Sequence, residues 1–144
     1  RVKIDELLKY YPFIGKDIQK EQEKLNEYIS LQAEARNPLK SISVDGMPRD
    51  GSVSDQTYQQ VEKIIDRYQA EIDKSIKKIN NLLDTKKWLD KALDELSRGE
   101  YELVRQYFWE RMSIRFMAKQ RKCSREQIKN MISFTCERIK KVIS

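Results

Sequence analysis

The chain has 144 residues, of which 36% are charged, with a net charge of +6, four glycines and three prolines. This composition favours a soluble, helical protein of one domain or of a helical domain with a small second module. The sequence has two cysteines and no histidine, which excludes most metal and acid–base chemistry, because zinc sites and nucleophilic cysteines depend on these residues.

The first apolar stripe advances in alternating steps of three and four residues, the heptad-like spacing of a helix that packs on another helix. Its members are Ile4, Leu8, Tyr11, Ile14, Ile18, Leu25 and Ile29, with Gln22 filling one place. Pro12 disturbs this pattern, because proline removes a backbone hydrogen bond and clashes with the previous turn. We therefore expect a break or a kink near Tyr11 and a main first helix over residues 13–36.

A loop is expected over residues 37–54. Asn37 and Pro38 end the first helix, and turn-forming residues are concentrated after them. The segment DGMPRDG in this loop is not a nucleotide-binding motif, since it lacks a preceding strand and the Gly-Lys-Ser/Thr ending of a phosphate-binding loop. A connection of this length is typical of a functional or mobile segment.

A second long helix is expected from an N-cap at Ser54 to about Leu96, without internal glycine or proline. Its stripe consists of Tyr58, Val61, Ile65, Tyr68, Ile72, Ile76, Ile79, Leu83, Leu89, Leu93 and Leu96. Folded back antiparallel, the first helix covers about half of this stripe. The remainder suits a second copy of the chain, so we expect a homodimer; a hairpin without a partner is the alternative.

Residues 1–96 are thus predicted to form a helical hairpin and oligomerisation region, and residues 97–144 a second domain. Gly99 interrupts the helical pattern and marks a hinge or helix boundary. Another helix should follow, because Tyr101, Val104, Tyr107 and Phe108 are at helical spacing.

Two short helices are predicted next, each beginning at a serine N-cap, Ser113 and Ser124, the latter with Glu126 and Gln127 in its first turn. Their inward-facing residues are Ile114, Met117 and Ala118 in the first helix and Ile128, Met131, Ile132 and Thr135 in the second. Two helices joined by about four residues, with a small Ala118 where they pack closely, are typical of a helix-turn-helix, whose second helix enters the major groove of DNA.

The charge distribution favours the same function. Residues 98–144 contain 12 Lys and Arg against 5 Asp and Glu, whereas the preceding 97 residues contain 17 against 18. Neutralised phosphates supply most sequence-independent affinity for nucleic acid, so this imbalance indicates a polyanion ligand; an ordinary solvated basic face is the alternative.

The second short helix also carries side chains that can read base edges or bind phosphates: Arg for guanine, Gln and Asn for adenine, Glu for cytosine and Lys for phosphate. We expect contacts with DNA from Arg115, Lys119, Arg121, Lys122, Ser124, Arg125, Glu126, Gln127, Lys129 and Asn130.

Three further residues are expected to pack inside the second domain. Trp109 is interpreted as packing against the edge of this domain, with a contact to DNA as the alternative. Cys123 and Cys136 are interpreted as small buried apolar residues that form no disulfide.

The run LDELSRGEYELVRQYFWERMSIRFMAKQRKCSREQIKNMISFTCERIKKVI resembles the helix-turn-helix of region 4 of bacterial sigma factors. In this resemblance Tyr107 is the aromatic residue, Ser113 the cap, Met117 and Ala118 the inward pair, Cys123 and Ser124 the end of the turn, and Ile128 the buried residue behind it. The turn departs from the family pattern, because Arg121 and Lys122 stand where leucine and glycine are usual.

The order of elements, with the loop SVDGMPRDG between long helices, resembles the ArpU/RinA group of transcriptional regulators from phages and prophages of Gram-positive bacteria. This group is associated with activating late genes for packaging and morphogenesis. By analogy with sigma region 4, the resemblance implies that Arg125, Glu126, Gln127, Lys129 and Asn130 face the major groove, with Arg115 and Lys119 nearer to the DNA backbone.

These observations predict an all-α protein in which a long antiparallel helical hairpin precedes a C-terminal sigma-region-4-like helix-turn-helix. We expect a sequence-specific DNA-binding transcriptional regulator that is not an enzyme and needs no cofactor. No apolar run approaches the roughly 20 residues that span a bilayer, so we expect a protein without a membrane segment, in the cytoplasm of a bacterial host.

The expected partners are double-stranded DNA and a second copy of the chain, with RNA polymerase as a further candidate. The alternative function is a non-enzymatic coiled-coil adaptor whose basic end binds RNA polymerase or another acidic protein.

Overall fold

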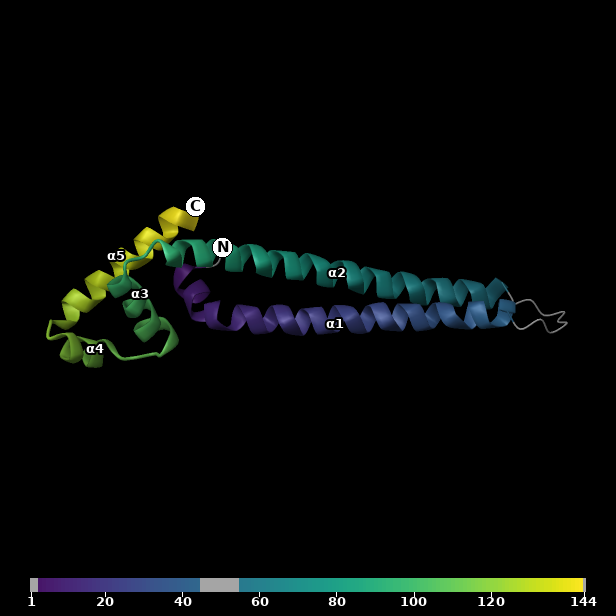
Figure 1. Cartoon of the computed structure of the whole chain (residues 1–144), viewed down its shortest axis with the longest axis horizontal. Helices are drawn as coiled ribbons and strands as arrows, with labels where there is room; N and C mark the ends of the chain where they lie inside the picture. Colours follow the sequence, from purple (N-terminus) through teal and green to yellow (C-terminus); the bar gives the residue numbers. More distant parts are fainter. Residues whose placement is uncertain (1–2, 45–54, 144) are drawn as a thin grey trace. The chain divides into compact units, whose positions relative to one another are not determined.

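The computed structural model describes residues 3–44 and 55–143, and all regular elements in these ranges are helices (Figure 1). In chain order they are α1 (Ile4–Val44), α2 (Asp55–Asp94), α3 (Arg98–Val104), the π-helical turn η1 (Arg105–Trp109), α4 (Ile114–Arg121) and α5 (Arg125–Ile143). The predicted all-α class is therefore confirmed for the described residues.

Contacts divide the chain into two compact units. One comprises residues 1–16 and 82–144, and the other comprises residues 17–81. Both long helices contribute to both units. The predicted assignment of residues 1–96 to oligomerisation and of residues 97–144 to DNA binding stays a prediction.

Within residues 17–81, α1 and α2 lie side by side in opposite directions (Figure 1). Gln32 donates from Nε2 to Oε1 of Gln69 at 3.0 Å, and further along, Ser75 donates from Oγ to Oε1 of Glu21 at 3.3 Å. The paired positions fall along α1 as they rise along α2, which is the antiparallel arrangement that the sequence predicts.

The inward face of this helix pair differs from the predicted stripes. Glu21, Gln32 and Ser75 are buried, whereas five predicted members of the two stripes are exposed: Gln22, Ile29, Tyr58, Ile76 and Leu83. Of two neighbouring residues, apolar periodicity assigns the apolar one to the inward face and the polar one to the surface. The polar residue nevertheless lies inward here, because its hydrogen bond is satisfied across the interface and the charge of Glu21 is paired with Lys78 at 3.4 Å.

Helix α1 is longer than predicted. It begins at Ile4, continues through Pro12 without a break and extends past Asn37 and Pro38 to Val44. The predicted break near Tyr11, the predicted main helix over residues 13–36 and the predicted loop beginning at residue 37 are therefore wrong. A proline removes a single N–H donor from the helix, and the residues after it supply donors again. The remaining predicted loop, residues 45–54, and the predicted N-cap Ser54 lie outside the described residues.

Helix α2 ends at Asp94, and α3 begins at Arg98. The boundary was predicted at Gly99, but Ser97 forms it: its Oγ accepts the N–H of Glu100 at 3.2 Å, and the Glu100 carboxylate accepts the N–H of Ser97 at 3.0 Å. This reciprocal capping box satisfies two otherwise unpaired donors and places Gly99 inside the first helical turn.

A contact between Trp109 and the start of α1 compensates for Pro12. Because proline has no N–H, the carbonyl of Leu8 loses its intrahelical donor, and Leu8 is fully buried. The indole Nε1–H of Trp109 donates to this carbonyl at 2.8 Å. The Trp109 ring also stacks on Tyr11, with centroids 5.4 Å apart, and meets the edge of Tyr101. The predicted packing role of Trp109 is confirmed.

Tyr11 connects α1 to α2 in the same unit. Its hydroxyl donates to Oδ1 of Asp90, and Nζ of Lys86 donates to Oδ2 of Asp90 at 2.8 Å. Burial and the Asp90 carboxylate raise the pKa of Tyr11. Burial alone would raise the pKa of Asp90, but the hydrogen bonds from Lys86 and Tyr11 lower it below its ordinary value.

The replacement Trp109→Phe retains the ring but removes the donor, so it should destabilise the protein by about 1–3 kcal/mol, the cost of a buried unpaired carbonyl. Urea unfolding measures this loss. Pro12→Ala is the matched background, because it restores an N–H for Leu8. There Trp109→Phe should cost less, and an equal loss in both backgrounds would contradict the proposed compensation.

Candidate nucleic-acid interface

The turn between α4 and α5 is short and closed by backbone bonds. Ser113 caps α4, its Oγ accepting the N–H of Phe116 at 3.1 Å, as predicted. Lys122 ends the helix with φ 55°, in the left-handed region, and the N–H of Cys123 donates to the carbonyl of Ala118 at 3.0 Å. Lysine therefore adopts the conformation for which glycine is usual, and α4 ends at Arg121.

The predicted N-cap of α5 is also confirmed. Oγ of Ser124 accepts the N–H of Gln127 at 3.1 Å, and Oε1 of Gln127 accepts the N–H of Ser124 at 2.9 Å. The two residues thus form a reciprocal capping box in which glutamine takes the place of glutamate. These bonds fix the first turn of α5. They also use the side-chain oxygens of Ser124 and Gln127, which are both predicted contact residues.

A small apolar core supports both helices. The buried cluster consists of Leu103, Met117, Ala118 and Ile128, with Tyr107, Met112, Ile114, Cys123 and Ile132 packed against it. The predicted inward positions of α4 are confirmed. In α5 the prediction fails at Met131, which is 40% exposed. Met131 lines an opening between α3 and α5, which leaves its side chain partly exposed.

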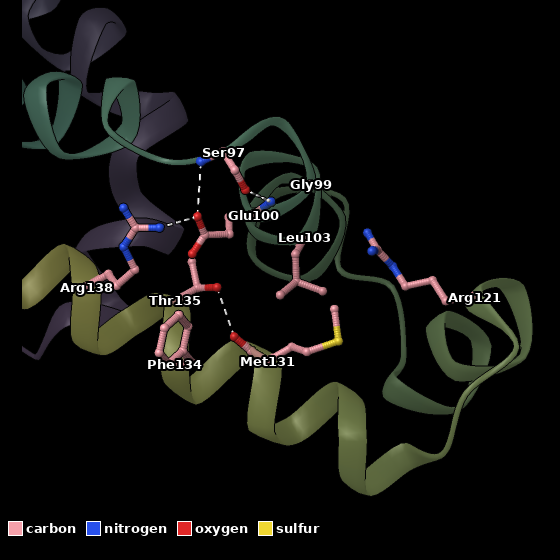
Figure 2. A pocket seen from close by; sticks show the side chains of 9 residues that line it. All are labelled: Ser97, Gly99, Glu100, Leu103, Arg121, Met131, Phe134, Thr135 and Arg138. Atoms are coloured by element: carbon pink, nitrogen blue, oxygen red, sulfur yellow. Dashed lines mark hydrogen bonds and ion pairs between the residues drawn. The ribbon is translucent and has the colours of Figure 1, made fainter.

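That opening is a pocket of about 380 Å³ between α3 and α5 (Figure 2). Leu103, Met131 and Phe134 provide its apolar wall, and Phe134 is 65% exposed. At one end, Arg138 donates to the carboxylate of Glu100 and thereby connects α5 to α3. Burial would raise the pKa of Glu100, but its bonds to Ser97 and Arg138 lower it below the ordinary value.

Nine of the ten predicted contact residues are exposed. They are Arg115, Lys119, Lys122, Ser124, Arg125, Glu126, Gln127, Lys129 and Asn130. The exception is Arg121, which is half-buried and donates from Nη2 to Oε1 of Gln106 at 3.1 Å. Its buried Nε has no hydrogen-bond partner in the described parts of the chain. Arg121 is thus engaged inside its own unit, which its neighbours in the sequence do not reveal.

Four of the exposed residues lie on the outward faces of the two helices. Arg115 and Lys119 are one turn apart on α4, and each lies two residues from the fully buried Met117. A step of two residues rotates an α-helix by about 200°, so both basic side chains lie opposite the core. Glu126 and Asn130 have the same relation to Ile128 in α5.

Sequence reasoning missed two exposed aromatic residues near these faces, Phe116 and Phe134, which are 53% and 65% exposed. Both fall outside the predicted apolar stripes, and this position could have identified them as exposed aromatic residues. It also missed the π-helical turn η1, in which the N–H of Glu110 donates to the carbonyl of Arg105 at 2.8 Å. Arg111 then takes φ 55° before α4 begins.

The two cysteines have different environments, and neither is paired. Cys136 is buried as predicted, whereas Cys123 is half-buried and packs against the core of the α4–α5 pair. Burial, together with the Asp5 carboxylate at 3.8 Å from Sγ, raises the pKa of Cys136 to about 11. Its thiol is therefore protonated at neutral pH.

Residues 3–44 and 55–143 contain no group of three or more Cys, Asp or Glu side chains placed to bind a metal ion. Within the same ranges, no helix combines the length and the apolar character needed to cross a membrane. In comparisons with known proteins, no family model, curated protein or solved structure matches the chain.

The replacement Lys122→Gly should stabilise the protein by about 1 kcal/mol, because glycine adopts a positive φ without the steric cost of a Cβ. Thermal or urea unfolding measures the change. Arg111→Gly tests the same argument at a second position, since Arg111 has the same φ of 55° outside the turn, and it should stabilise the protein to a similar extent. Destabilisation by Lys122→Gly would contradict the left-handed turn.

Proposed function

We propose that the chain is a sequence-specific DNA-binding transcriptional regulator. The observation that carries the proposal is the α4–α5 pair, in which two capped helices on a common core expose nine predicted contact residues. The pair lies in the third of the chain that carries all of the excess positive charge. Short helices joined by a tight turn suit insertion of the second helix into the major groove.

In this proposal α4 and α5 form a helix-turn-helix like that of sigma factor region 4. Arg115 and Lys119 then lie toward the phosphate backbone, while Arg125, Lys129 and Asn130 contribute to the surface that enters the groove. The element order supports an ArpU/RinA-type phage or prophage regulator, with activation of late genes as its proposed role. Selection of bound fragments from random and phage DNA tests binding, sequence preference and half-site spacing together.

Arg125→Ala should cost about 1–3 kcal/mol of binding free energy on the selected site and relax its specificity, because a base contact is lost. Lys119→Ala should weaken binding to all sequences alike and lower the salt slope by about one, because it removes a phosphate contact. Fluorescence anisotropy over a salt series measures both changes.

The control variant is Lys77→Ala, an exposed lysine on α2 in the other unit, which should change neither affinity nor salt slope. Equal affinity of the wild type for selected and scrambled duplexes would refute the proposed recognition of bases.

We also propose that the regulator is a homodimer formed through its helical hairpin. Tyr58 and Ile76 are both 43% exposed, and they lie eighteen residues apart, which is five complete turns of α2. The two side chains therefore share one line along the helix, beside the buried stripe. A second copy that covers this line would remove apolar surface from water and double the number of half-sites.

Sedimentation at micromolar concentration should give a dimer for the wild type and a monomer for Ile76→Lys, because a charge in the interface loses its hydration. Ile64→Lys is the matched control: Ile64 is 40% exposed on the same helix, but about 120° away from Ile76. A monomeric wild type, or equal effects of both lysines, would refute this interface.

A coiled-coil adaptor that binds RNA polymerase or another acidic protein is the second candidate. The pocket between α3 and α5 favours it, because the exposed side chains of Met131 and Phe134 give this pocket an apolar wall that a protein partner can cover. Salt-sensitive binding to such a protein, together with no binding to any duplex, would decide for the adaptor.

A further inference from the structure

The pocket between α3 and α5 has an apolar wall that is large enough to receive a side chain from another molecule. Leu103, Met131 and Phe134 form this wall, and the volume of the pocket is about 380 Å³ (Figure 2). A cavity of about 150 Å³ already holds a benzene ring. The pocket therefore has room for a bulky apolar side chain such as that of leucine, methionine or phenylalanine.

The same pocket has an excess of positive charge. Three of the side chains that line it are ionised: Glu100, Arg121 and Arg138. Arg138 donates to the carboxylate of Glu100, so these two charges compensate each other. Arg121 donates from Nη2 to the neutral amide of Gln106, and it forms no ion pair with any side chain in the described parts of the chain. The uncompensated guanidinium favours a ligand that carries a carboxylate.

The exposure of the apolar wall favours a protein segment over a small molecule as this ligand. Leu103 is buried, but Met131 is 40% exposed and Phe134 is 65% exposed. A small molecule inside the pocket would leave much of the Phe134 ring in water, whereas a protein segment that crosses the pocket covers it. Aromatic residues, methionine and arginine are also the side chains in which the centres of protein interfaces are enriched.

The pocket lies on the side of α5 away from two residues of the proposed DNA contact. Phe134 follows Arg125 by nine residues, which is two and a half helical turns, and Met131 follows Lys129 by two residues. Each spacing rotates the side chain by about 180–200°, so the members of each pair point in opposite directions. A protein segment in the pocket therefore leaves Arg125 and Lys129 accessible.

We propose that the pocket between α3 and α5 binds an acidic segment of a partner protein, which inserts one bulky apolar side chain and places an Asp or Glu carboxylate on Arg121. This inference goes beyond the proposed DNA binding and does not depend on it, because it uses other side chains. It also specifies the chemistry that the partner presents, for a regulator and an adaptor alike.

The test selects random peptides from a display library on the full chain. The enriched peptides should combine Leu, Met, Phe or Trp with a nearby Asp or Glu. One of them, labelled with a fluorophore, then gives dissociation constants by anisotropy. Phe134→Ala should weaken its binding about tenfold or more, the effect of losing an aromatic residue at the centre of an interface. Phe116→Ala is the matched control, since Phe116 is 53% exposed and lies outside the pocket, and it should have no effect.

The proposed carboxylate contact is tested separately. Arg121→Gln should weaken peptide binding about tenfold, the worth of a hydrogen bond between charged groups. Arg98→Gln removes the same charge from a side chain that is 95% exposed and does not line the pocket, so it should change the affinity little. A peptide with Asn or Gln in place of its acidic residues should bind the wild type more weakly but lose nothing further on Arg121→Gln.

Enriched peptides without acidic residues, or equal binding of the selected peptide to the wild type, Phe134→Ala and Arg121→Gln, would overturn this inference. A selection that enriches no peptide would overturn it as well. The proposed function is judged independently: a wild type that binds the selected peptide in this pocket but binds no duplex supports the docking site and refutes DNA recognition. Phe134→Ala should retain the wild-type affinity for DNA and the wild-type thermal midpoint.

Discussion

The hydrogen bond from Trp109 to the Leu8 carbonyl is the contact on which the unit of residues 1–16 and 82–144 depends. Pro12 leaves this buried carbonyl without its helical donor, and an unpaired buried carbonyl is costly. The π-helical turn η1 brings the indole to it, and Tyr11, stacked on the same ring, bonds to Asp90 of α2. Trp109 thus satisfies the carbonyl that one proline leaves unpaired, and its ring also contacts the tyrosine that joins α1 to α2.

The helix pair of residues 17–81 obeys a similar constraint. Its inward face includes Glu21, Ser75 and Gln32, and each makes hydrogen bonds across the pair, Gln32 to the Ile65 carbonyl as well as to Gln69. Sliding one helix past the other by a turn would separate these partners and leave polar groups buried without bonds. The polar contacts therefore favour one register among the many that a repeated apolar stripe permits.

Capping also engages side-chain groups of the candidate interface. The hydroxyl of Ser124 and the amide oxygen of Gln127 are used by the start of α5, and the guanidinium of Arg121 is directed to Gln106. Residue types at the surface of a helix are thus an incomplete guide to ligand contacts. Only the groups left over after the helix ends and the core are satisfied, such as the amide of Asn130, are fully available.

The sequence alone determined the all-helical class, the caps at Ser113 and Ser124, the packing of Trp109, and the burial of Met117, Ala118 and Ile128. These features follow from local chemistry and from the 3.6-residue period. Only the tertiary structure decided the inward places of Glu21 and Ser75, the exposure of Met131, the course of α1 through Pro12 and the engagement of Arg121. Each depends on a partner distant in the chain or on the space between helices, and periodicity within one segment carries no information about either.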